Sequence, residues 1–295
     1  MPAAVTSNPT AAFYGGERLA RWLAMAVRAA HGVAPAIGTG LALRLFFTPL
    51  PTKTAARRRP VPAPWHAQRF PLEGGSAVLW RRLDIEAAHP GRAPVLLVHG
   101  WAGDAMQMRT LGDALAQAGC TPLLLDFPGH GRADGWRSTL PQFVRTLFAV
   151  QARVGPLHGL VAHSLGALAG AHAAAKGLAV ERLVLLSPSP PPSKVITWFA
   201  HAFGVGEVLA RRMKQTIEGR EGIPLDQFEA GWLGPRLQRP TLVMHDRIDR
   251  AAPLAAGKAL AAALPNGRLV VTEGLGHRRG LNDASVIDAV VRHLS

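Results

Sequence analysis

Short apolar runs that alternate with longer helical segments constrain the fold more than any other feature of this 295-residue chain. These runs are Val95–Val98, Pro122–Leu125, Leu160–Ala162, Leu183–Leu186, Thr241–Met244 and Leu269–Val271. Runs that are apolar throughout, rather than at every second residue, indicate strands that are buried on both faces. The pattern therefore predicts an α/β fold with a mostly parallel central sheet and helices on both faces.

The chain before residue 95 divides into two parts. Arg69–Leu72 and Ala77–Leu83 flank the pair Gly74-Gly75 and predict a β-hairpin. Residues 1–64 are predicted to form an N-terminal helical segment followed by an extended, solvated linker rich in proline and arginine. The length of the chain allows one large domain with such additions, and we place that domain at residues 65–295.

The alternation stops between Leu186 and Thr241, where roughly fifty residues contain no strand pattern. A simple crossover needs only about a dozen residues. We therefore expect a helical cap, at about residues 188–239, inserted after the sixth strand. Aromatic residues of this insertion are candidates for the roof of a substrate pocket, although they would serve equally well as the core of the cap itself: Trp198, Phe199, Phe203, Phe228 and Trp232.

The net charge is +14, and half of it lies in residues 1–64. The rest is spread along the remaining chain, and 28 of the 33 basic residues are arginines, so we expect no nucleic-acid partner. Leu19, Trp22 and Leu23 begin an apolar stripe at helical spacing. Residues 15–48 are thus candidates for peripheral contact with an anionic membrane, but packing against the main domain or self-association with a second subunit is the interpretation we favour.

Targeting signals are not evident in the sequence. The N-terminus lacks the basic and apolar regions of a signal peptide, and we find no uncharged apolar stretch of 18 residues. The single cysteine, Cys120, excludes a disulfide within the chain. A cytoplasmic protein is expected, with membrane contact left open.

The segment Leu160–Leu168, with the sequence LVAHSLGAL, carries the strongest chemical signal. It predicts a strand that runs directly into a helix with Ser164 at the junction. Such a turn forces the serine into a strained conformation and presents its hydroxyl above the sheet. Ala162 and Gly166, two residues before and after, are small enough to allow the turn.

Four further motifs occur in residues 65–295: LLVHGWAG at residues 96–103, DFPGHG at 126–131, VMHDRIDRAAP at 243–253 and EGLGH at 273–277. With the serine motif they follow the order found in the α/β-hydrolase family, which this part of the chain resembles. One departure is Ala162, where the family usually has glycine. The resemblance implies a serine esterase-like enzyme whose serine, acid and histidine occur in this chain order.

Ser164, Asp249 and His277 are the residues that match the catalytic positions of the family. A serine hydroxyl needs a base, and a histidine oriented by a carboxylate supplies one. Asp246 competes for the role of the acid, but the position of Asp249 relative to Pro253 matches the family better. The backbone amides of Trp101 and Leu165 are expected to form the oxyanion hole.

The sequence therefore predicts a serine hydrolase that cleaves a carboxylic ester or related acyl bond of a small, partly apolar molecule. No metal or organic cofactor is expected. The alternatives are acyl transfer, thioester or amide hydrolysis and cofactor-free peroxidation by the same three residues, or a non-catalytic binding protein on this scaffold.

Overall fold

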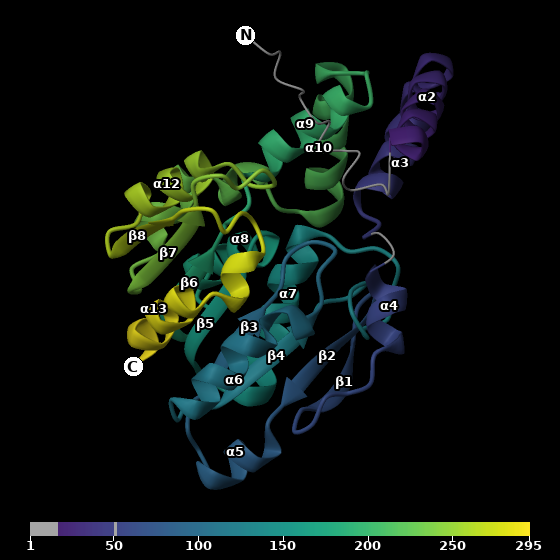
Figure 1. Ribbon diagram of the computed structural model, residues 1–295. Coiled ribbons are helices and arrows are strands. Elements are labelled where there is room, and N and C mark those ends of the chain that lie inside the picture. Colours follow the sequence, from purple (N-terminus) through teal and green to yellow (C-terminus); the bar gives the residue numbers. More distant parts are fainter. Residues whose placement is uncertain (1–16, 50–51) are drawn as a thin grey trace.

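The computed structural model describes residues 17–49 and 52–295 and contains one eight-stranded sheet (Figure 1). The first sixteen residues of the predicted N-terminal segment thus lie outside the described part. The strands follow the order β1-β2-β4-β3-β5-β6-β7-β8. Their bounds are β1 His66–Leu72, β2 Gly75–Arg81, β3 Val95–Val98, β4 Pro122–Asp126, β5 Leu157–His163, β6 Val180–Leu186, β7 Thr241–Asp246 and β8 Gly267–Thr272.

The six strands from β3 to β8 are parallel to their neighbours, and the β1–β2 hairpin joins this block through an antiparallel β2–β4 pair. The predicted α/β fold and the predicted strands are confirmed. The second hairpin strand begins and ends two residues earlier than predicted, because Gly75 already pairs with Leu72 and the short helix α5, Leu83–Ala88, follows Arg81 closely.

Helices cover both faces of the sheet, because successive strand residues point to opposite sides. Leu96 and Val98 pack in one core with α7 Leu140–Val154, α8 Leu165–Ala175 and α12 Leu254–Ala263. Val95 and Leu97 pack in a second core with α6 Arg109–Gln117 and α13 Ala284–Leu294.

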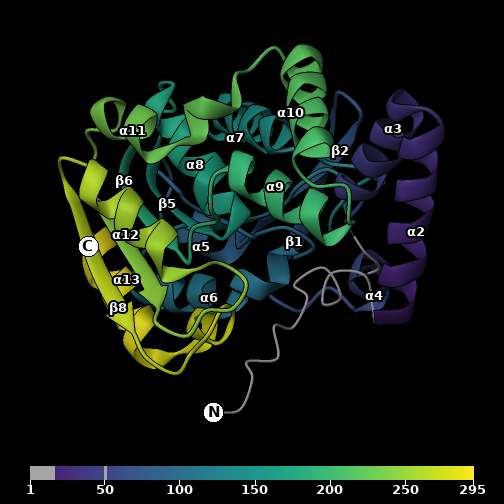
Figure 2. The same ribbon diagram turned by 90° about the horizontal axis from the view of Figure 1, so that it is seen from above.

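The helical insertion expected after the sixth strand is present between β6 and β7 (Figure 2). It consists of α9 Pro192–Ala202, α10 Glu207–Glu221, η2 Leu225–Phe228, α11 Ala230–Leu233 and η3 Gly234–Arg236. Its first residues pass beside the end of β5, since the amide of Ser189 donates to the carbonyl oxygen of Ser164 at 3.1 Å. The insertion therefore begins next to the predicted nucleophile.

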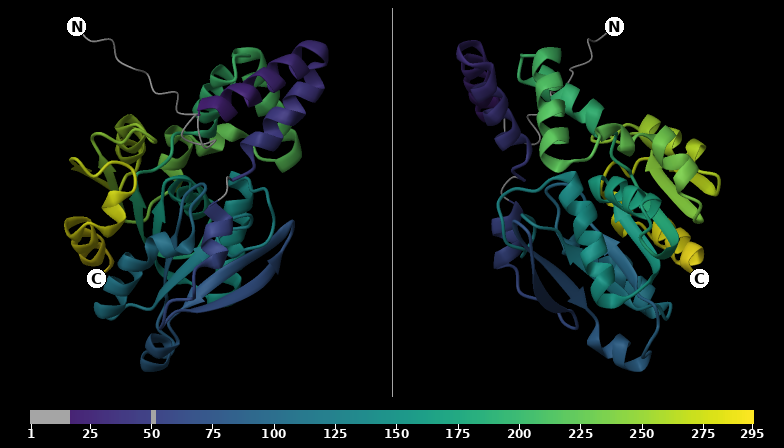
Figure 3. Two further views of the ribbon diagram at one scale, coloured as in Figure 1. Left: turned by 45° about the vertical axis from the view of Figure 1, so that its right-hand side comes forward. Right: turned by 180° about the vertical axis from the view of Figure 1, so that it is seen from behind.

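The N-terminal helices α2 Glu17–Val33 and α3 Pro35–Phe46 form a hairpin that lies beside α10 (Figure 3). The stripe is divided: Leu19 and Trp22 are exposed, Trp22 to 70%, whereas Leu23 packs against the main core together with the buried residues Ala20 and Val27 of α2. No helix in the described part of the chain is long and apolar enough to cross a membrane.

The predicted extended linker is partly wrong, because Thr52–Arg58 forms the helix α4. Ion pairs hold this region to the main domain: Arg57 binds Asp134 at 3.0 Å and Arg59 binds Asp104 at 3.5 Å. The acidic partners come from distant loops, so the local composition of the segment does not reveal them.

Candidate active site

Ser164 lies at the sharp turn between β5 and α8. Its backbone has φ 54° and ψ −119°, a conformation that few residues other than glycine adopt. The turn packs tightly against the loop after β3, because a Cβ added to Gly166 would clash with the carbonyl oxygen of His99 at 2.3 Å. A Cβ on Gly100 would lie 2.6 Å from the Cβ of Ser164. Glycine at these two positions lets the strand ends approach the serine closely.

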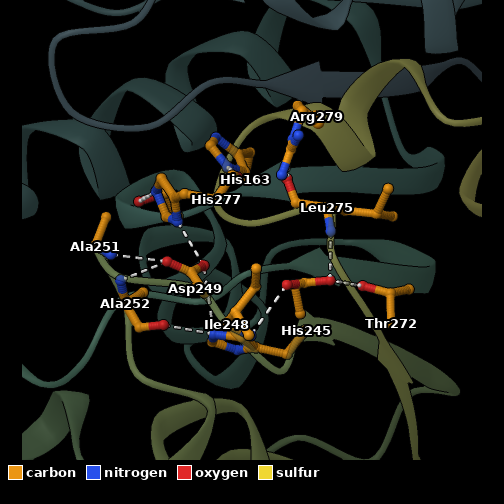
Figure 4. A network of polar contacts seen from close by, with 12 residues as sticks. His163, His245, Ile248, Asp249, Ala251, Ala252, Thr272, Leu275, His277 and Arg279 are labelled. Atoms are coloured by element: carbon orange, nitrogen blue, oxygen red, sulfur yellow. Dashed lines mark hydrogen bonds and ion pairs between the residues drawn. The ribbon is translucent and has the colours of Figure 1, made fainter.

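Ser164, His277 and Asp249 meet at the edge of the sheet where the parallel strands end. The Nε2 of His277 is 3.0 Å from the Oγ of Ser164. Its Nδ1 is 2.7 Å from the Oδ2 of Asp249 (Figure 4). Because Asp249 can only accept, the ring donates through Nδ1–H and leaves Nε2 free to accept the serine proton. This is the arrangement that activates a serine hydroxyl.

The carboxylate of Asp249 is fully buried, yet it is held as an anion. Burial by itself would raise the pKa of Asp249, but hydrogen bonds from His277 and from the amides of Ala251 and Ala252 lower the pKa below its ordinary value. Both amides donate to Oδ1 at 2.9 Å. Oδ2 therefore remains directed at the imidazole.

Asp246, the competing acid, serves the loop rather than the histidine. Its carboxylate accepts from the amides of Ile248 and Leu275 and from the hydroxyl of Thr272, at 2.9–3.1 Å. Burial opposes ionisation, but these hydrogen bonds lower the pKa of Asp246. Asp246 thus ties the loop after β7 to the loop after β8, so it fixes the two segments that carry Asp249 and His277.

Two further histidines contact the site, although neither is among its predicted catalytic residues. The Nε2–H of His163 donates to the carbonyl oxygen of His277 at 2.9 Å. Burial, and then the neighbouring His277, lower the pKa of His163 to about 3, so this ring stays neutral and positions its neighbour. The Nε2–H of His245 donates to the carbonyl oxygen of Ala252 at 2.7 Å and lies 3.5 Å from Oδ2 of Asp249.

The predicted oxyanion-hole donors, the amides of Trp101 and Leu165, belong to two segments that meet at the serine. Leu165 begins α8, so its N–H has no partner within the helix. Trp101 follows Gly100, which touches Ser164. The loop is held by His99, whose Nδ1–H donates to the carbonyl oxygen of Gly100 at 2.7 Å and whose Nε2 accepts from the amide of Phe127 at 3.3 Å.

Backbone strain is concentrated at this edge of the sheet. In the described segments, the residues other than glycine with positive φ are Ala102 at 53°, Ser164 at 54° and Ser187 at 45°. They follow the ends of β3, β5 and β6, which are neighbours in the sheet. Strained residues of this kind gather where the surrounding structure must hold a precise geometry.

The aromatic residues proposed for a pocket roof lie mostly in packing contacts. Phe199 and Phe203 stack with ring centroids 4.3 Å apart, and Phe199 also meets Phe46 of the hairpin. Phe228 and Trp232 both stack on His172 of α8, so they attach the insertion to the main domain. The remaining candidate, Trp198, is 41% exposed on α9.

A metal centre has no support in the described residues. Across residues 17–49 and 52–295 there is no group of three histidine, cysteine or acidic side chains that could hold a metal ion. The buried histidines that surround the site, such as His99 and His163, instead bind backbone groups.

Comparisons with known proteins agree with this architecture. The sequence model of the family described as alpha/beta hydrolase fold matches residues 93–234, and the model described as TAP-like protein matches residues 224–295. The chain therefore has the α/β-hydrolase fold. A comparison with curated protein sequences gave no match.

Solved structures show the same fold at low sequence identity. Est1E from Butyrivibrio proteoclasticus, solved with ferulic acid, has a TM-score of 0.57 at 20% identity, and the match covers 77% of this chain and 96% of Est1E. The serine hydrolase CCSP0084 from Cycloclasticus zankles has a TM-score of 0.57 at 17% identity, with 77% and 96% covered. A bromoperoxidase from Bacillus anthracis has a TM-score of 0.57 at 14% identity, with 78% and 99% covered.

Proposed function

We propose that this protein is a serine hydrolase that cleaves a carboxylic ester or related acyl bond through Ser164, His277 and Asp249. The observation that carries the proposal is the continuous chain of hydrogen bonds from the Ser164 hydroxyl through His277 to the buried carboxylate of Asp249. If these three residues only supported the fold, the serine that begins this series of hydrogen bonds would not need to lie in a strained turn.

The reaction follows from this geometry in two stages. The Oγ of Ser164 attacks the carbonyl carbon while its proton passes to Nε2 of His277, and the amides of Trp101 and Leu165 stabilise the oxyanion. The intermediate then collapses, the alcohol leaves with the proton from His277, and an acyl-serine remains. Water attacks the acyl-serine, gives its proton to His277, and releases the acid as the proton returns to Ser164.

The acyl or alcohol group of the substrate is proposed to be partly apolar. What supports this is the immediate surroundings of Ser164, where the half-buried side chains of Trp101 and Leu165 belong to the main apolar core. The reaction requires no metal or organic cofactor, because the residues of the site supply the nucleophile, the base and the oxyanion donors.

A panel of p-nitrophenyl esters of rising chain length tests this proposal. We expect turnover by the wild-type protein and at least a thousandfold loss of kcat in Ser164→Ala and in His277→Ala, since each removes an essential member of the set. Thr216→Ala, which alters an exposed part of α10, is the control and should keep its activity. Equal turnover by wild type and Ser164→Ala would contradict the proposal.

A further inference from the structure

We propose that the N-terminal helical hairpin, α2 and α3, binds the surface of a membrane that contains anionic phospholipids. Two independent features carry this proposal: an exposed row of apolar side chains on α2, and a groove at the end of α3 that is lined by three arginines.

The apolar row occupies one side of α2. Its members recur at intervals of three and four residues, which places them on one face of the helix, and all are exposed: Leu19, Trp22, Ala26, Ala29 and Val33. Trp22 is 70% accessible and Val33 is 88% accessible. Large apolar side chains that are so exposed and so aligned mark a surface that contacts another apolar phase.

An exposed face of α3 adds to the surface of the hairpin. Ile37, which is 66% accessible, shares this face with Gly40 and Arg44, three and seven residues later. The two helices meet where Gly38 approaches His31. At about 100° per residue, Ile37 and Arg44 lie roughly a quarter turn or more from Gly38, so this face is turned away from α2.

The arginine groove has a volume of about 260 Å³ and joins α3 to α10 and to the loop before α7. Its charged members are Arg44, Arg137 and Arg220, and Leu43 and Phe47 supply an apolar wall. None of the three guanidinium groups forms an ion pair or hydrogen bond with another described residue. A guanidinium group can donate two parallel hydrogen bonds to the oxygens of one phosphate. The groove therefore suits a phosphate head group beside an acyl chain.

The charge of the segment favours lipid over a second copy of the chain. Residues 18–72 contain nine basic residues and no aspartate or glutamate. A twofold dimer would place the same face of each copy against the other, so arginine would meet arginine without an acidic partner. An anionic membrane offers the opposite charge, and each basic residue near such a surface strengthens binding several-fold.

Co-sedimentation of the full chain with vesicles tests the proposal. The vesicles contain either equal parts of phosphatidylglycerol and phosphatidylcholine or phosphatidylcholine alone. One variant, Trp22→Ser with Val33→Ser, removes the apolar anchors, and another, Arg44→Gln with Arg137→Gln and Arg220→Gln, removes the groove charges. The matched controls are Val208→Ser, at a side chain that is 55% exposed, and Arg211→Gln, which lies on the opposite side of α10 from Arg220.

We expect the wild type and both controls to sediment with the anionic vesicles and not with the neutral ones. Each test variant should bind the anionic vesicles more than about tenfold less tightly. Thermal unfolding checks that the variants fold, and fluorophosphonate labelling of Ser164 should be the same in all of them. The proposal fails if the wild type does not bind anionic vesicles, if both test variants bind as the wild type does, or if light scattering shows a dimer that Trp22→Ser abolishes.

Discussion

Replacing Gly100 by alanine should damage the site while leaving the fold in place. The new Cβ would lie 2.6 Å from the Cβ of Ser164 and 3.1 Å from its Oγ, whereas carbon atoms in contact normally stay about 3.5–4.0 Å apart. Ser164 cannot easily yield, because it sits in a turn that packs against the same loop through Gly166. The serine and the loop must therefore separate by about 1 Å.

A displacement of this size predicts a large kinetic effect and a modest thermodynamic one. Misplacing a reacting group by about 1 Å costs roughly a hundredfold in rate. Overpacking of a close contact costs about 1–3 kcal/mol in the free energy of unfolding. We therefore expect kcat/KM for a p-nitrophenyl ester to fall about a hundredfold in Gly100→Ala, with cooperative thermal unfolding retained.

Gly219→Ala is the matched control for this experiment. Gly219 lies within α10, and a Cβ there meets nothing within 4 Å. Alanine at this position should leave kcat/KM unchanged and raise the free energy of unfolding by about 0.4–1 kcal/mol. If Gly100→Ala keeps its kcat/KM within twofold of the wild type, the close packing of this loop on Ser164 does not govern the chemistry.

Three further predictions concern the two acids near His277, the buried His163 and the buried His172. Asp249→Asn should lower kcat about 10⁴-fold, because an amide at this position favours the wrong tautomer of the His277 imidazole. Asp246→Asn should mainly lower the free energy of unfolding, by about 1–3 kcal/mol. Esterase assays measure the first effect and urea unfolding measures the second. His163→Phe should lower kcat about tenfold without moving the pH profile, because a ring with a pKa of about 3 only positions its neighbour; a shifted profile would contradict this role. Burial lowers the pKa of His172 to about 4 in the folded protein, whereas the same side chain in the unfolded chain has a pKa of about 6.5. Between these two values the unfolded state binds the proton and the folded state does not, so the free energy of unfolding should fall as the pH drops from about 6.5 to 4. Urea titrations should show a weaker pH dependence in His172→Phe; an unchanged dependence would refute this.

Much of the fold was predictable because local signals agreed with the global arrangement. The run Val95–Val98 is apolar at every position, and the structure makes it a strand buried on both faces. Ser164 could be assigned to a sharp turn because a strand pattern passes into a helix pattern without a loop. The loops that follow parallel strands meet at one edge of a sheet, so the chain order of the motifs was enough to bring Asp249 and His277 into the same region.

Contacts between distant side chains could not be predicted in the same way. The exposure of Trp22 depends on which face of α2 packs against α3. Apolar residues lie on more than one face of that helix, so the sequence pattern does not identify the buried face. The stacking of Phe228 on His172 depends on how the insertion settles on α8, which no local pattern encodes. The hydrogen bond from His163 to the carbonyl oxygen of His277 joins residues 114 positions apart and leaves no trace in either motif.

Covalent labelling with a fluorophosphonate tests the central claim most directly, because it requires an activated serine but no knowledge of the natural substrate. The serine oxygen displaces fluoride from phosphorus and the adduct is located by mass spectrometry of the peptides. The account predicts one adduct, on Ser164, which is absent in Ser164→Ala and slowed at least a hundredfold in His277→Ala. A folded wild-type protein that gains no adduct, or gains it on another residue, would contradict the account.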